Sequence, residues 1–93
     1  MKLPKELTFI ADAGHGYLKV PMNILETYGL VGKISDFSFK SKNFGFLEED
    51  CDAGLFLKTI KEQGNEHHYK IVEKHVDGYA ACRNYERFVK KGV

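Results

Sequence analysis

Several features that would assign a small protein to a class are scarce in this sequence. Its 93 residues include two cysteines, Cys51 and Cys82, which are too few and too far apart for the disulfide framework of a small secreted domain. No apolar run approaches the length of about 18 residues that crosses a membrane, and no charged-then-apolar leader opens the chain. We therefore expect a soluble protein of the reducing cytoplasm that has no membrane partner.

A large excess of one sign of charge is also lacking. The formal net charge is +1, which falls short of the positive charge that strong duplex-DNA binders usually carry. The charges are uneven along the chain, with an acidic cluster in the middle and an excess of bases near the end. The acidic cluster comprises Glu48, Glu49, Asp50 and Asp52. The bases are Lys70, Lys74, Arg83, Arg87, Lys90 and Lys91. This C-terminal excess permits an acidic partner without requiring one.

The composition is that of a folded chain, with 43% apolar and 13% aromatic residues, and the length suits one domain over residues 1–93. Residues 79–93 form a basic-aromatic segment, in which tyrosine and phenylalanine alternate with arginine and lysine. Arginine and tyrosine are enriched at binding hot spots, so this segment is the preferred partner surface. The alternative is a segment that covers the sheet and turns a solvated face outward.

The first third of the chain predicts a β-hairpin followed by a helix. Residues 7–11 and 17–20 are β-prone runs, and the turn between them contains two glycines that are free to adopt positive φ. Pro21 suits the first position of a helix, and apolar residues follow it at helical spacing. Gly29 and Gly32 are expected to end that helix.

A second hairpin is predicted from residues 34–40 and 44–48, where apolar and polar residues alternate. Its apolar positions are four phenylalanines, Phe37, Phe39, Phe44 and Phe46. They suit either the hydrophobic core beneath two helices or an exposed platform on which unpaired bases stack. A domain of this size can scarcely exclude four phenylalanines from its core, which favours the first interpretation.

The acidic cluster precedes a second predicted helix, with Glu49 or Asp50 as the expected N-cap and Gly64 as its end. Residues 69–76 predict a last strand, and residues 81–89 fit either a helix or a strand. The predicted order is therefore β-β-α-β-β-α-β. This order indicates an α+β fold in which two helices cover one face of an antiparallel sheet, as in a ferredoxin-like fold or a duplicated ββα unit.

One short stretch, residues 42–47 (KNFGFL), has a basic residue followed by alternating aromatic residues and glycine. It resembles the third-strand signature of the RNA recognition motif. Asn43 stands where that signature has glycine, and Glu49 where it has a last aromatic residue. The resemblance therefore implies a convergent topology, and it adds a single-stranded nucleic-acid site to the hypotheses. The residues predicted for that site are Lys40, Lys42, Phe44 and Phe46.

Three stretches are distributed over nearly the whole chain: residues 12–21 (DAGHGYLKVP), 47–53 (LEEDCDA) and 85–88 (YERF). They resemble a family of small uncharacterised proteins carried by phages, plasmids and bacterial accessory DNA. That family supplies no activity to carry over. The resemblance implies a mobile-element origin, and small accessory proteins of mobile DNA often bind and block a host or competitor machine, including defence systems.

Few residues suggest catalysis or metal binding. His15 lies between two glycines, and Asp12 three residues earlier makes an imidazole–carboxylate pair conceivable, although a histidine in a turn more often serves its own loop. No Cys-x-x-Cys motif and no i, i+4 histidine pair is present, so we expect neither a metal nor a cofactor. Cys51 has acidic neighbours that disfavour a thiolate, and we interpret it as structural.

Three hypotheses about function result. The first is a non-catalytic interaction protein, not an enzyme, that binds and modulates a protein partner; a homodimer through an open sheet edge is a further option. Its predicted contact residues are His15, Tyr79, Arg83, Tyr85, Arg87 and Phe88. The second is the single-stranded nucleic-acid module described above. The third is a small enzyme that uses His15 and Asp12 as acid and base.

Overall fold

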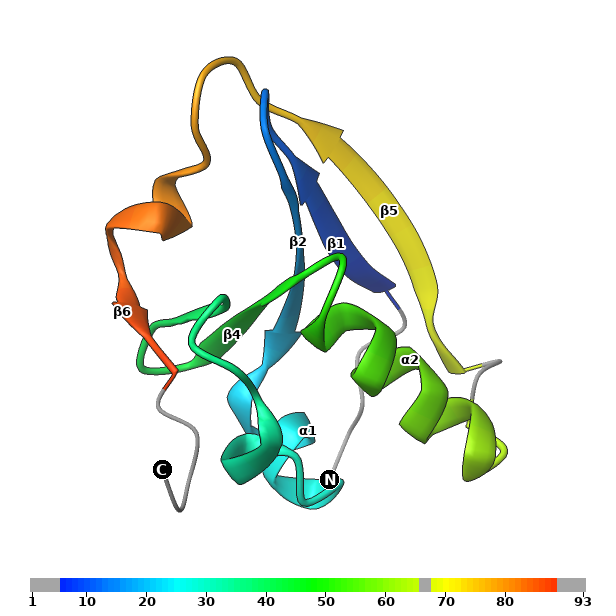
Figure 1. Ribbon diagram of the computed structural model, residues 1–93. Coiled ribbons are helices and arrows are strands. Elements are labelled where there is room, and N and C mark those ends of the chain that lie inside the picture. Colours follow the sequence, from blue (N-terminus) through cyan, green and yellow to red (C-terminus); the bar gives the residue numbers. More distant parts are fainter. Residues whose placement is uncertain (1–5, 66–67, 89–93) are drawn as a thin grey trace.

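The protein has an α+β fold in a computed structural model, of which residues 6–65 and 68–88 are described. A six-stranded mixed sheet has the order β5-β1-β2-β4-β3-β6 (Figure 1). The strands are β1 (Glu6–Ala11), β2 (Gly16–Pro21), β3 (Phe39–Lys40), β4 (Phe44–Glu48), β5 (Lys70–His75) and β6 (Glu86–Arg87). The helices are α1 (Met22–Thr27) and α2 (Asp52–Glu62), and short 3-10 turns occupy Val31–Lys33 and Ala81–Asn84.

The predicted first hairpin is confirmed, because β1 and β2 pair antiparallel from Thr8↔Lys19 to Ala11↔Gly16. The predicted role of its glycines is wrong. Positive φ occurs in the described residues only at Gly29, Gly64 and Gly78. Gly16 is needed for space instead, since a Cβ there would lie 2.2 Å from the Phe9 ring.

The expectation of a purely antiparallel sheet is wrong at one edge, where β5 pairs parallel to β1 from Glu6↔Lys70 to Ala11↔His75. The two antiparallel steps from β1 through β2 make β4 run in the same direction as β1. Helix α2 then carries the chain back across the sheet, so the strand that follows it runs parallel to β4 and β1. A sixth strand, β6, adds to β3 at the opposite edge.

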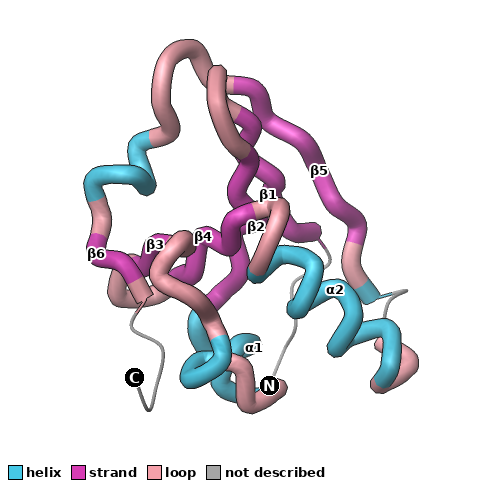
Figure 2. Tube along the Cα trace, in the orientation of Figure 1, coloured by secondary structure: helices cyan, strands magenta, loops and turns pink. Residues whose placement is uncertain are grey.

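Both helices cover one face of the sheet, as Figure 2 shows, and they share one hydrophobic cluster. That cluster combines helix residues such as Ile24 and Phe56 with Leu18 and Leu47 of the sheet. The predicted phenylalanine face is not the one beneath the helices. Successive residues of β4 alternate between faces, and Phe46 belongs to a second cluster on the other face.

The C-terminal segment covers this second face. The chain leaves β5, arches over the sheet and reaches β6 at the far edge (Figure 1). Ala80 and Cys82 of this segment are buried against the aromatic side chains of β2, β3 and β4. The Tyr85 ring packs on Phe46 with a centroid distance of 5.4 Å. Residues 81–89 were expected to form either a helix or a strand. The structure has a 3-10 turn at Ala81–Asn84 and the short strand β6 at Glu86–Arg87, and residue 89 lies outside the described residues.

Three local expectations also differ from the structure. The predicted strand over residues 34–40 is reduced to Phe39–Lys40, and Phe37 is 60% exposed. Pro21 ends β2 and directly precedes α1 instead of starting it. Neither predicted N-cap is used, because α2 begins at Asp52 after Cys51. The predicted ends of the helices are confirmed at Gly29 and Gly64, which follow the helix C-caps with positive φ.

The longest described helix, α2, has 11 residues. In the described ranges, no helix combines the length and apolar composition that a membrane span needs.

We expect Phe88→Ala to lower the free energy of unfolding by about 3–5 kcal/mol, because Phe88 is 1% exposed and belongs to the cluster beneath the helices. Leu57→Ala, at a position that is 42% exposed on α2, is the matched control and should cost much less. Urea unfolding measures both variants. Equal losses would show that the end of the C-terminal segment contributes little to the core.

Candidate functional site

Three of the six predicted contact residues, His15, Arg83 and Arg87, line a cleft of about 490 Å³, which we call the His15 cleft. It lies where the β1–β2 loop, the β4–α2 connection and the C-terminal segment meet. The cleft is lined by three basic side chains, two acidic side chains and four others. The basic residues are His15, Arg83 and Arg87, the acidic residues are Glu48 and Asp50, and the others are Tyr17, Phe37, Phe39 and Cys51.

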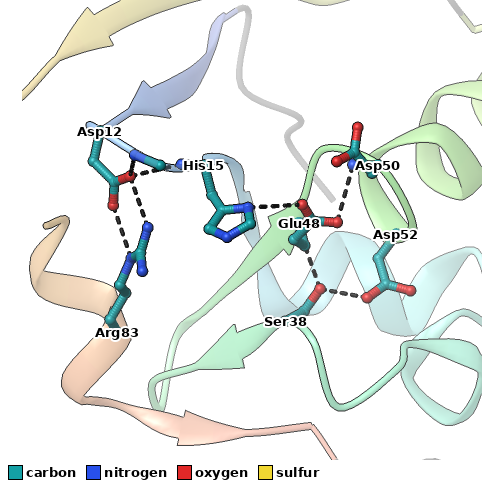
Figure 3. A network of polar contacts seen from close by, with 8 residues as sticks. Asp12, His15, Ser38, Glu48, Asp50, Asp52 and Arg83 are labelled. Atoms are coloured by element: carbon teal, nitrogen blue, oxygen red, sulfur yellow. Dashed lines mark hydrogen bonds and ion pairs between the residues drawn. The ribbon is translucent and has the colours of Figure 1, made fainter.

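The carboxylate of Asp12 is the structural centre of this region (Figure 3). Its side chain has no exposed surface. Its Oδ1 accepts hydrogen bonds from the backbone N–H groups of Gly14 (2.9 Å) and His15 (2.8 Å), and its Oδ2 accepts one from Ala80 (2.8 Å). Arg83 donates Nε to Oδ2 (2.9 Å) and Nη2 to Oδ1 (2.8 Å). One carboxylate therefore joins the β1–β2 loop to the C-terminal segment.

This ion pair stays charged across the neutral range. Burial alone would raise the pKa of Asp12, but the hydrogen bonds from Arg83 and from the backbone N–H groups of Ala80, His15 and Gly14 hold that pKa well below its usual range. The same carboxylate raises the pKa of Arg83. The Arg83 guanidinium also lies 4.4 Å from the Tyr79 ring centroid and 5.8 Å from that of Tyr17. The Arg83 guanidinium therefore stabilises the fold through its pairing with Asp12.

The predicted acid/base pair of His15 and Asp12 is not formed. The Asp12 carboxylate is occupied by Arg83 and the backbone, and the imidazole Nδ1 of His15 lies 3.6 Å from Oε1 of Glu48 instead (Figure 3). Glu48 is nearly buried, and its Oε2 accepts a hydrogen bond from the backbone N–H of Asp50 (3.0 Å). His15 itself remains half exposed at the rim of the cleft.

A second buried carboxylate holds the loop that carries Phe37. Asp52, in the first turn of α2, accepts hydrogen bonds from the backbone N–H (3.0 Å) and hydroxyl (2.6 Å) of Ser35. It also accepts one from the Ser38 hydroxyl, which in turn accepts the backbone N–H of Glu48 (2.9 Å). In the sequence, Asp52 stands out only as one member of the acidic cluster. The structure makes it the anchor of the 35–38 loop.

Cys51 is exposed at the cleft, but its environment disfavours the thiolate. Desolvation and the neighbouring carboxylates, Glu48 first among them, raise the pKa of the Cys51 thiol. A thiol with a raised pKa is a poor nucleophile and a poor metal ligand at neutral pH. Among the described residues, no cluster of three or more histidine, cysteine, aspartate or glutamate side chains is arranged to hold a metal ion.

The structure separates the six predicted contact residues. His15, Arg83 and Arg87 line the His15 cleft, and Tyr79, which is 72% exposed, stacks on Arg83 beside it. Tyr85 is 43% exposed on the other side of the C-terminal segment. Phe88 is buried in the core beneath the helices and cannot serve as a surface contact, because its ring completes that cluster.

The four predicted nucleic-acid residues do not form one exposed platform. Phe46 is 6% exposed beneath Tyr85, and Phe44 is half-buried with the Lys19 ammonium 4.2 Å from its ring centroid. Lys40 and Lys42 line a separate hollow of about 680 Å³ together with Tyr85. This hollow is larger than the His15 cleft, but it gathers fewer ionisable and aromatic groups.

Sequence reasoning missed the contributions of Phe37, Glu48, Asp50 and Cys51 to the cleft. One signal was available for Phe37, since it lies among polar residues, with Ser35 and Asp36 before it and Ser38 after it. An isolated aromatic residue in such a polar stretch is more typical of a loop than of a strand.

Comparisons of the chain with protein-family models, curated proteins and solved structures found no match.

We expect Asp12→Asn to lower the free energy of unfolding at neutral pH by roughly 3 kcal/mol, because it leaves the Arg83 guanidinium beside a neutral partner. The pKa of Asp12 is depressed in the folded state. Its stabilising contribution is therefore present above the ordinary carboxyl pKa of about 4 and is lost as the pH falls toward the folded value. Urea unfolding at neutral pH and at about pH 3 measures both effects.

The matched control is Asp77→Asn, which neutralises an exposed aspartate in the turn after β5. This change should alter stability by less than about 0.5 kcal/mol. The gap between wild type and Asp12→Asn should shrink in acid. An equal gap at both pH values, or an equal effect of the control, would contradict the assigned role of the ion pair.

Proposed function

We propose that this chain is a non-catalytic interaction protein that binds a protein partner through the His15 cleft and modulates it. The observation that carries the proposal is the set of exposed hot-spot residue types around a braced cleft. Phe37 is 60% exposed, Tyr79 is 72% exposed, and Arg87 presents an exposed guanidinium. Aromatic and arginine side chains supply most of the binding energy in typical protein interfaces.

The two buried carboxylates support this proposal because they fix the cleft walls before a partner arrives. Asp12 holds the β1–β2 loop against the C-terminal segment, and Asp52 holds the loop that carries Phe37. A surface that is ordered in the free protein loses less conformational entropy on binding. The Asp52 contacts hold Ser35 and Ser38, before and after Phe37, and the Asp12 contact with Ala80 holds the backbone next to Tyr79.

The chemistry of the cleft favours binding over turnover. The thiol of Cys51 has a raised pKa, and the carboxylate nearest to His15 is itself bonded to the backbone of Asp50. A catalytic site needs a nucleophile or base whose pKa and geometry suit the reaction. The Cys51 thiol does not meet this requirement at neutral pH.

The mobile-element origin is part of the same proposal and rests on the resemblance described above. Of its three stretches, residues 12–21 and 47–53 contribute His15, Tyr17, Glu48, Asp50 and Cys51 to the cleft, and residues 85–88 contribute an arginine. A phage- or plasmid-borne binder would have a host or competitor macromolecule as its partner, an inference by association.

A second candidate function, single-stranded nucleic-acid binding, is favoured by the hollow that Lys40, Lys42 and Tyr85 line. Lysine with an exposed ring is a typical combination for phosphate contact and base stacking. Such binding would weaken steeply with salt and would be lost in Lys42→Glu. Binding that is unaffected by this change would remove the second candidate.

The test of the first proposal is quantitative capture from a lysate of the bacterial host. We expect a partner protein to co-purify with the wild-type chain and its recovery to fall at least tenfold in Arg87→Glu and in Phe37→Ala, because both changes remove exposed hot-spot groups. Lys58→Glu, an equal charge reversal at an exposed position of α2, is the control and should retain the partner.

Folding of each variant is checked by urea unfolding, so that a lost complex is not a lost fold. Retention of the partner by both cleft variants would contradict the proposal. Loss of the complex on nuclease treatment would transfer the support to the nucleic-acid candidate.

A further inference from the structure

The two arginines of the His15 cleft differ in what they bind. Arg83 has a carboxylate across its guanidinium, with Nε and Nη2 bonded to Asp12. Arg87, four residues later, donates Nη1 to the backbone carbonyl of Asp36 (2.9 Å). Within residues 6–65 and 68–88, Arg87 forms no ion pair with a carboxylate. A guanidinium carries more N–H donors than this single bond uses.

Arg87 is nevertheless held in place. Its guanidinium lies 4.8 Å from the centroid of the Phe39 ring, which is itself buried. The pairing of Phe39 with Arg87 across β3 and β6 fixes the backbone beneath the side chain. A stacked, backbone-bonded arginine with unused donors is already ordered for a planar anion, and a carboxylate can take two parallel N–H bonds from it.

The acids of the cleft limit which anion fits. Glu48 is nearly buried beside His15, while Asp50 is exposed and its carboxylate forms no ion pair in the part of the chain described. Closely spaced phosphates carry more negative charge than a single carboxylate does, so the acids of the cleft would repel them more strongly.

Three aromatic residues also line the cleft. Phe37 is 60% exposed, and Tyr17 and Phe39 pack edge to face with a centroid distance of 5.7 Å. The cleft therefore combines a site for an anion, an apolar surface and a site for a cation. Its volume of about 490 Å³ suits a few side chains, not a whole domain.

We propose that the His15 cleft receives a short segment of a partner protein that places a carboxylate on Arg87, an apolar side chain on Phe37 and a lysine or arginine near Asp50. This inference rests on the proposed function and names the chemistry of its partner. The inference is supported by the opposite charges of Arg87 and Asp50, which the charges of such a segment would complement. The N–H donors of Arg87 that no described residue occupies would make the specific contact.

The experiment uses a display library of short random peptides selected on the immobilised full chain. We expect the selected peptides to share an aspartate or glutamate, an apolar residue and a lysine or arginine. A synthetic copy of one such peptide should bind at least tenfold more weakly to Arg87→Gln than to wild type, with Arg87→Lys between them, because lysine is a point charge without the paired donors. Lys58→Gln on α2 is the control and should bind as wild type does.

A double-mutant cycle then isolates the contact. Replacing the peptide carboxylate by an amide should weaken binding to wild type and leave binding to Arg87→Gln nearly unchanged. Independent effects of the two changes would overturn the inference, as would selected peptides without an acid, failure to select any peptide, or displacement of the peptide by oligothymidylate or by a second copy of the chain.

These results are separable from the test of the proposed function. A captured partner that depends on Phe37 and Arg87 but carries no acidic segment would sustain the proposed function and refute this inference. A failed capture together with acidic peptides bound at Arg87 would show a recognition site for peptides and would remove the support for a stable partner complex.

Discussion

The carboxylate of Asp12 is the contact on which the functional side of this protein depends. It bonds to the β1–β2 loop through Gly14 and His15 and to the C-terminal segment through Ala80 and Arg83. A backbone hydrogen bond from the N–H of Ala13 to the carbonyl of Gly78 (3.1 Å) also joins these two elements. A buried charge is costly unless it is paired, so removing any one of these partners would destabilise the folded protein.

The consequences extend across the second face of the sheet. Once the C-terminal segment is docked, Ala80, Cys82 and Tyr85 cover the aromatic residues that the helices leave open. The chain can then add β6 to β3, and that pairing places Arg87 over Phe39. The cleft thus depends on the polar anchors of the fold, because the contact between Arg83 and Asp12 holds the segment that carries Arg87.

Much of the fold could be predicted because it is local. The β-prone runs predicted the first hairpin and the last long strand, and helical spacing with glycines at the helix ends predicted both helices. Alternation also correctly predicted that Phe46 and Leu47 lie on opposite faces of the sheet. It could not predict which face the helices cover, because that depends on how the chain crosses back over the sheet. The parallel pairing of β5 with β1 depends on the same path.

The site was predictable in part for a similar reason. His15 and Arg87 could be chosen because a histidine between glycines and a basic-aromatic segment are visible in sequence. The partner of Asp12 could not, since Arg83 is 71 positions away and His15 was the nearer candidate. Phe88 looked like part of an exposed segment, yet its burial depends on the β6–β3 pairing that no local pattern encodes.

Backbone amide exchange tests the central claim most directly, because the N–H groups of Gly14, His15 and Ala80 all bond to one carboxylate. The account predicts slowed exchange at these amides in the wild type and faster exchange at all three in Asp12→Asn, with the amides of the β2–β4 pair still protected. Unchanged exchange at Ala80 in that variant would show that the C-terminal segment is held by other contacts, and would contradict the account.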